Sequence, residues 1–128
     1  MIVAGIGCRR GAAARDVEAA IRAALARAGL TAAALDAIAT MLGKDEEPGI
    51  ATAAKKLGVR VVALQQGALE AVSERAATRS ARVLARAGVP SVAETAALAA
   101  AGADARLIAT RLVVGGAACA LAESGDAP

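Results

Sequence analysis

Short apolar runs and longer stretches of helical periodicity alternate along the first part of this chain. An apolar run over residues 1–4 is typical of a buried strand, and apolar residues at helical spacing predict an amphipathic helix over residues 13–28. Glu18 and Arg22 stand four residues apart on that helix, a spacing that allows an ion pair. A second strand is expected over residues 35–39, so a strand–helix–strand unit opens the chain.

The rest of the chain continues this alternation and ends in a different pattern. The further elements expected are a helix beginning at Pro48, a strand over residues 60–64, helical turns over 67–72, a loop over 73–79, and helices over 80–87 and 91–101. Residues 106–114 and 117–122 flank Gly115-Gly116, the pattern of a β-hairpin with a two-residue glycine turn. The order of elements predicts an α/β fold, a three-layer α/β/α sandwich with a mixed sheet that ends in a C-terminal β-hairpin. Residues 1–122 are expected to form a single domain, and residues 123–128 a flexible tail.

The motif GIGCRRG, residues 5–11, stands between the first strand and the first helix. Backbone N–H groups in such a turn, and the positive end of the following helix dipole, favour an anion. Gly5, Gly7 and Gly11 let the backbone approach a ligand closely, because no Cβ stands in the way. The alternative is a tight turn with two solvated arginines. A nicotinamide dinucleotide is not indicated, because the third glycine comes one residue late and Asp36 stands at the start of the second strand.

Composition removes several classes of chemistry from consideration. The 128 residues are 57% apolar, much of that alanine, and include no aromatic residue and no histidine. Aromatic stacking on bases or on a flat macrocycle, imidazole metal ligation and histidine acid–base catalysis are therefore excluded. The net charge is +3 with dispersed arginines, so we expect no nucleic-acid partner. The sequence has neither a signal-peptide pattern nor a long uncharged apolar stretch, so a cytoplasmic protein without membrane association is expected.

The two cysteines, Cys8 and Cys119, lie far apart in the sequence. This separation leaves a disulfide open, and it does not match the ligand spacing of a zinc site. We therefore expect no metal and no cofactor.

Two further motifs begin helices. KDEEPG, residues 44–49, follows the second strand, and its Pro48 suits a first helical turn. Ser91 and Glu94 have the spacing of a capping box, in which each side chain bonds the other residue's backbone N–H. If the first two strands are parallel neighbours, the loops after them lie at one edge of the sheet, and KDEEPG borders the same cleft as GIGCRRG.

Together these motifs resemble those of the CobE and CbiG C-terminal domain family of cobalamin biosynthesis. The matching parts are GIGCRRG, KDEEPG, SVAETAAL at residues 91–98 and the hairpin over residues 106–122, in the same order over nearly the whole chain. The family typically has an aspartate–glutamate pair before Pro-Gly, where this chain has Glu46 and Glu47. The larger CbiG protein is described as a cobalt-precorrin-5A hydrolase that opens a lactone and releases acetaldehyde, and this chain resembles only its last portion.

The resemblance implies a precorrin or cobalt-precorrin ligand, a macrocycle fringed with acetate and propionate carboxylates. The residues expected to bind it are Gly5, Gly7, Arg9, Arg10, Gly11, Lys44, Ser91 and Glu94. Arginine forms bidentate, charge-assisted pairs with carboxylates, which suits such a rim. The alternative for the two arginines is a salt bridge to Glu46 or Glu47. The alternative for Ser91 and Glu94 is the capping box alone.

The candidate catalytic residues are Cys8, Glu46 and Glu47. A helix N-terminus and adjacent cations lower the pKa of a thiol, which would make Cys8 a nucleophile or a thiolate ligand. The alternative is a small residue that fits the turn. A carboxylate of Glu46 or Glu47 would serve as general base for lactone opening, and the alternative is helix capping and solvation.

Three functions are therefore open. The first is a cobalamin-pathway protein that binds a precorrin intermediate and has other pathway enzymes as partners. The second is an α/β enzyme that binds a nucleotide or phosphate at the glycine-rich turn, and the third is a non-catalytic interaction module. Because the chain lacks histidine and tyrosine and resembles only the end of the hydrolase, we expect it to bind the intermediate without opening the lactone alone.

Overall fold

A five-stranded mixed sheet with the strand order β3-β2-β1-β5-β4 forms the middle of the molecule. The computed structural model describes residues 1–75 and 92–125. Its main elements are β1 (Ile2–Cys8), α1 (Ala14–Arg27), β2 (Ala37–Met41), α2 (Pro48–Leu57), β3 (Arg60–Leu64), α3 (Gln66–Ala71), α5 (Val92–Ala101), β4 (Arg106–Val114) and β5 (Ala117–Glu123). Short 3₁₀ turns lie at residues 32–34, 44–46 and 73–75.

Strand β1 is central in this sheet, with partners on both sides. It runs parallel to β2, where Gly5 is opposite Ala39, and antiparallel to β5, where Gly5 is opposite Ala120. Strands β2 and β3 are also parallel, whereas β4 and β5 form the antiparallel hairpin. The sheet is therefore mixed, as predicted, and the hairpin over Arg106–Val114 and Ala117–Glu123 is confirmed.

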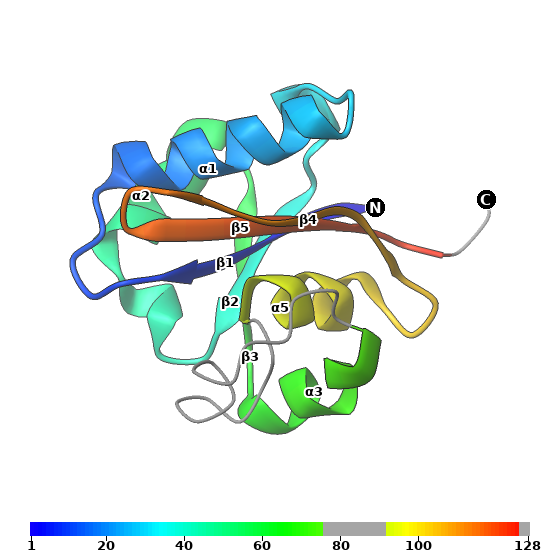
Figure 1. The fold of residues 1–128 in the computed structure, drawn as a ribbon. Coiled ribbons are helices and arrows are strands. Elements are labelled where there is room, and N and C mark those ends of the chain that lie inside the picture. The colour runs from blue at the N-terminus through cyan, green and yellow to red at the C-terminus, as the bar shows by residue number, and fades with distance from the viewer. Residues whose placement is uncertain (76–91, 126–128) are drawn as a thin grey trace.

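Helices cover both faces of the sheet. Figure 1 shows α1 and α2 on one face and α3 and α5 on the other, which confirms the predicted three-layer α/β/α sandwich. Each face has its own apolar core. The core beneath α1 and α2 includes Ile6, Val17, Ile21, Leu25, Ile38, Ile50 and Leu121. The core beneath α3 and α5 includes Val3, Ala39, Leu69, Ala97 and Leu98. None of the helices described is long and apolar enough to cross a membrane.

The first strand is longer than predicted, and this changes the position of two glycines. The apolar run was expected to end at residue 4, but β1 continues to Cys8 and contains Gly5 and Gly7. An ideal Cβ at Gly5 would overlap Ala93 O and lie 2.7 Å from Ala97 N, both on α5. The glycine is therefore required by the close approach of a helix to the sheet and not by a turn of the chain.

Helix α5 is suited to this approach because its side chains are small. Ala93, Ala96, Ala97 and Ala101 are all buried, and Leu98 is its one large buried apolar residue. An alanine-rich surface lets the helix backbone lie near the sheet backbone without leaving voids.

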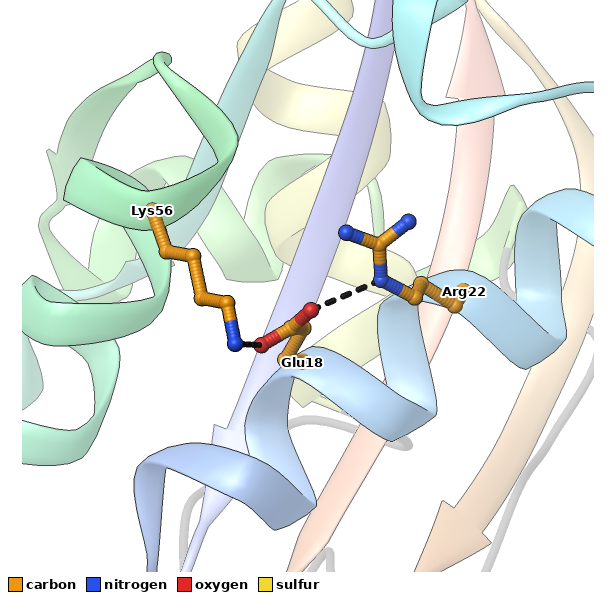
Figure 2. Close-up of polar contacts among 3 residues, drawn as sticks. All are labelled: Glu18, Arg22 and Lys56. Carbon is orange, nitrogen blue, oxygen red and sulfur yellow. Dashed lines mark hydrogen bonds and ion pairs between the residues drawn. The ribbon is translucent and has the colours of Figure 1, made fainter.

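The predicted pair of Glu18 and Arg22 is present and extends to a third residue. Arg22 Nε lies 2.7 Å from Glu18 Oε2, and Lys56 Nζ of α2 lies 3.2 Å from Glu18 Oε1. Figure 2 shows the carboxylate of Glu18 between the two cationic side chains, so it joins α1 to α2. The hydrogen bonds from Arg22 and Lys56 lower the pKa of Glu18 below its ordinary value of 4.5.

The carboxyl end of the chain is ordered further than predicted. Glu123 is the last residue of β5 and accepts hydrogen bonds from Arg106 at 2.7 and 3.1 Å. Ser124 N donates to Met1 O at 2.9 Å. The predicted tail therefore began too early, since residues 123–125 belong to the folded part and residues 126–128 lie outside the described residues.

Most other boundaries agree with the sequence analysis within two residues. The second strand begins at Ala37 and not at residue 35, and residues 73–75 form a 3₁₀ turn within the predicted loop. The predicted helix over residues 80–87 lies outside the described residues.

We predict that Gly5→Ala destabilises the protein, whereas Gly67→Ala does not. The Cβ of Gly5→Ala would meet the backbone of α5, and overpacking of this kind costs about 1–3 kcal/mol or more. Gly67 lies in α3 with nothing within 4 Å of an added Cβ, so alanine there gains helix propensity of up to about 1 kcal/mol. Urea unfolding followed by far-ultraviolet circular dichroism measures both variants. Equal stability of Gly5→Ala and wild type would show that α5 does not pack on β1 in this way.

We also predict that Glu18→Gln destabilises the protein at pH 7 and has little effect in acid. Because the folded-state pKa of Glu18 is lowered, its contribution is present above the unfolded pKa and is lost as the pH falls through the folded pKa. The difference in unfolding free energy between wild type and Glu18→Gln should therefore shrink as the pH falls below 4.5. Glu74→Gln, at an exposed position without an ion pair in the described residues, is the matched control and should leave the stability at pH 7 near that of wild type.

Candidate functional site

Three parallel strands bring their carboxyl ends to one edge of the sheet. These ends are Cys8 of β1, Met41 of β2 and Leu64 of β3. The turn Gly115-Gly116 lies at the same edge, because it leads into β5, which is antiparallel to β1 and pairs Ala117 with Cys8. In open α/β sheets, ligands bind outside the carboxyl ends of the strands, so this edge is the candidate site.

The loops after β1 and β2 touch one another directly. Gly11 N donates to Glu47 Oε1 at 2.8 Å. Gly49, at the start of α2, lies so close to the other loop that a Cβ there would overlap Ala12 O. The prediction that GIGCRRG and KDEEPG lie at the same edge is therefore confirmed, and the bond between Gly11 and Glu47 joins them.

The hairpin turn is also bonded to the loop after β1, residues 9–13, here called the arginine loop. Arg9 N donates to Gly116 O at 2.9 Å, and Gly116 N donates to Asp16 Oδ2 at 3.5 Å. Gly115 has a φ of +56°, a conformation that favours glycine, and a Cβ there would meet the carboxylate of Asp16. The sequence analysis did not single out Asp16 or the hairpin turn as parts of the site. An acidic residue in a first helical turn was the one available sign.

Arg9 and Arg10 are exposed at this edge, as is Gly11. Within residues 1–75 and 92–125 neither arginine makes an ion pair. The alternative of a salt bridge to Glu46 or Glu47 is therefore not what the structure contains. Two guanidinium groups are presented to solvent from a loop whose backbone is fixed at both ends.

The N-terminus of α1 lies close to the start of α2. The helix begins at Ala14, and a Cβ at Gly49 would lie 3.3 Å from Ala14 N, so the start of α2 lies close to this N–H. The predicted role of the helix dipole in anion binding stays a prediction. The side chains exposed to an anion at this loop are those of Arg9 and Arg10, whereas the N–H of Gly11, whose φ of +75° suits glycine, is bonded to Glu47.

The start of α5 lies near the same edge, although its predicted ligand residues do not both face it. An ideal Cβ at Gly7 would lie 3.8 Å from Ala93 N. Ser91 lies outside the described residues, so neither its capping box nor its ligand role is described. Glu94 is fully buried, and its Oε2 accepts the N–H of Arg111 from β4 at 2.9 Å. The carboxylate of Glu94 therefore joins α5 to β4 and has no open surface toward a ligand.

A family model described as the cobalamin synthesis G C-terminus matches residues 2–122. The chain belongs to this family. It is accordingly a protein of the cobalamin biosynthesis pathway, and the predicted resemblance is confirmed.

Individual relatives agree with this assignment. Protein CobE of a Sinorhizobium species is 39% identical over 121 residues, which is 94% of this chain and 79% of that protein. The crystal structure of CobE, a protein from the cobalamin biosynthetic pathway, is 37% identical with a TM-score of 0.89 and covers 95% of this chain and 92% of its own. The cobalamin biosynthesis protein chiG from Agrobacterium tumefaciens is 46% identical with a TM-score of 0.73, over 98% of this chain and 100% of its own.

A structure with much lower sequence identity has the same fold. A cobalamin biosynthesis protein G homologue from Sulfolobus solfataricus is 20% identical with a TM-score of 0.73, over 96% of this chain and 36% of its own. Nearly all of this chain thus corresponds in fold to about a third of that larger protein.

Within this family fold, Cys8 lies at the end of β1 and is half-buried. Burial raises the pKa of its thiol above the ordinary value of 9.0, Lys44 lowers that pKa, and Glu47 raises it. The predicted lowering of the thiol pKa is therefore wrong, because Cys8 precedes α1 by six residues and lies partly inside the sheet. Cys119 is fully buried, burial raises its pKa, and both cysteines are free thiols.

Two acidic residues of the KDEEPG segment accept backbone hydrogen bonds, and the third is exposed. Asp45 Oδ1 accepts the N–H of Gly43 at 2.9 Å, and Glu47 Oε1 accepts that of Gly11. Glu46 is exposed, and Lys44 is close enough to Cys8 to influence its thiol. Among the residues described, no group of three or more acidic or sulfur ligands is placed to hold a metal ion. The arrangement is suited to binding an anionic ligand at an open edge.

We predict that Cys8 reacts slowly with iodoacetamide at pH 7 and faster as the pH rises, with a midpoint above 9.0. Because Glu47 raises the pKa and Lys44 lowers it, Glu47→Gln should lower the midpoint and Lys44→Met should raise it. Alkylation rates measured from pH 6 to 11 by mass spectrometry, in a Cys119→Ala background, give these midpoints. A midpoint below 7 would mean that Cys8 is an activated thiolate after all.

Proposed function

We propose that this protein binds a precorrin or cobalt-precorrin intermediate through carboxylates on the rim of the macrocycle, and that it does not open the lactone alone. The observation that carries the proposal is the pair of exposed arginines, Arg9 and Arg10, which have no ion-pair partner in the described part of the chain. Both lie at the edge where the loops after β1 and β2 meet.

The backbone of the arginine loop supports this role. Its position is set by the bond from Arg9 N to Gly116 O and by the bond from Gly11 N to Glu47. A loop fixed before binding loses little conformational entropy when a ligand arrives. Arginine in such a loop can form two parallel hydrogen bonds with one carboxylate, and an acetate or propionate side chain presents that carboxylate.

The chemistry near the arginines favours binding over hydrolysis. Burial keeps Cys8 in its thiol form at neutral pH, so it is a poor nucleophile. One oxygen of Glu47 is engaged with Gly11, and the sequence contains neither histidine nor tyrosine as a further base. The family resemblance to the last portion of a larger hydrolase is consistent with a part that holds the intermediate.

The test is a titration with a corrinoid that carries free acetate and propionate groups, followed by its visible absorbance. Arg9→Ala/Arg10→Ala should weaken binding by about 1.5–3 kcal/mol for each charge-assisted bond lost, with non-additivity between the neighbours. The matched control is Arg27→Ala/Arg60→Ala, which removes the same charge from exposed positions at the opposite edge of the sheet. Wild-type affinity in the Arg9/Arg10 variant, or binding of a nucleotide in preference to the corrinoid, would contradict the proposal.

Mass spectrometry of the recovered ligand separates binding from catalysis. We expect the pathway intermediate to be recovered unchanged after incubation with the wild-type protein. Recovery of a ligand that has lost a two-carbon fragment, with this loss abolished by Cys8→Ser, would make the protein an enzyme.

A further inference from the structure

We propose that Leu42 supplies the apolar contact for the ring of the bound macrocycle; this inference rests on the proposed function and adds the residue that distinguishes a ring from a simple carboxylate. The side chain of Leu42 is 58% exposed. The other large apolar side chains exposed in the described residues are Met1 and Val113. A ligand that covers an exposed leucine is bound more tightly, because apolar surface is then removed from water.

The position of Leu42 places it beside the arginine loop. In the parallel pair of β1 and β2, Gly5 is opposite Ala39, and the hydroxyl of Thr40 donates to Ile6 O at 2.8 Å. The paired register ends at Gly5 and Ala39; extended by three residues, it brings Leu42 opposite Cys8, the residue before Arg9. Neighbouring strands lie about 4.8 Å apart, so on this extension the leucine lies near the arginine loop.

The backbone of Leu42 is held in place and does not belong to a free loop. Its N–H donates to Leu64 O at 2.8 Å, which continues the alignment of β2 with β3 past the last strand residue. The next residue, Gly43, has a φ of +101° and donates to Asp45 Oδ1 at 2.9 Å. The chain therefore turns away from the sheet directly after Leu42, which stays at the edge of the sheet.

The other exposed apolar residues do not share this position. Met1 precedes β1 and lies at the opposite edge of the sheet. Val113 lies toward the same edge but on the outer strand β4, which β5 separates from β1. Of these three side chains, that of Leu42 is thus the one that follows a strand directly neighbouring β1.

The chemistry of the proposed ligand suits such a contact. A corrin-type ring has apolar faces and a charged rim, and this chain has no aromatic side chain with which to stack on a face. An aliphatic contact is therefore what remains for the ring, while the arginines take the rim. Leu42 and the arginine loop together match both parts of the molecule.

The experiment is the same corrinoid titration, carried out at low and at high salt with Leu42→Ala and Leu42→Asp. We expect Leu42→Ala to weaken binding about tenfold at both salt concentrations, because an apolar contact is not screened by ions. Leu42→Asp should weaken it further, since it adds a negative charge beside the carboxylate rim. The Arg9→Ala/Arg10→Ala variant should instead flatten the salt dependence. Val113→Ala, which truncates an equally exposed apolar residue on β4, is the control and should bind like wild type.

The outcomes separate this inference from the proposed function. If both Leu42 variants bind like wild type while the arginine variant binds weakly, Leu42 does not contact the ligand and the proposed function stands. If the arginine variant also binds like wild type, the proposed function fails. Far-ultraviolet circular dichroism should show wild-type thermal unfolding for Leu42→Ala, because the side chain is largely exposed in the free protein.

Discussion

The close approach of α5 to β1 is the constraint on which the rest of this structure depends. The helix backbone lies where a side chain on Gly5 would otherwise be, with Ala93 and Ala97 as its nearest residues. This contact lets β1 continue as a straight strand to Cys8 with a helix on each side of it. The loop that follows is thereby delivered to the open edge of the sheet, where it meets the loop after β2.

Local sequence signals were sufficient to predict the helices and strands of the described residues, but not to explain Gly5 and Gly7 of the first motif. The strand Arg60–Leu64 and the turn Gly115-Gly116 were predicted because β-branched residues and paired glycines act through neighbouring residues. Gly5 and Gly7 were assigned to a turn, because a glycine that opens a turn and one that admits a helix look alike in sequence. Only the packing of α5, which lies about 90 residues further along the chain, distinguishes them.

In the candidate site, too, the features set by strand topology could be predicted, and those set by the local surroundings of a side chain could not. The contact between the loops that contain Gly11 and Glu47 could be predicted, because parallel neighbouring strands end at the same edge of a sheet whatever their side chains are. The state of Cys8 was not accessible in this way, because its pKa depends on how much of the thiol the surrounding sheet covers. Leu42 gave no signal at all, since one leucine after a strand is ordinarily part of a core.

The bond from the backbone N–H of Arg111 to the carboxylate of Glu94 affects an outer strand of the sheet. Strand β4 is an outer strand of the sheet, and outer strands are templates on which a second chain can assemble. The pairing of β4 with β5 is irregular between Leu107 and Leu112, and Glu94 binds a backbone N–H within that irregular stretch. An irregular outer strand with one of its backbone donors bonded to Glu94 is a poorer template for a second chain than a regular strand with all its donors free.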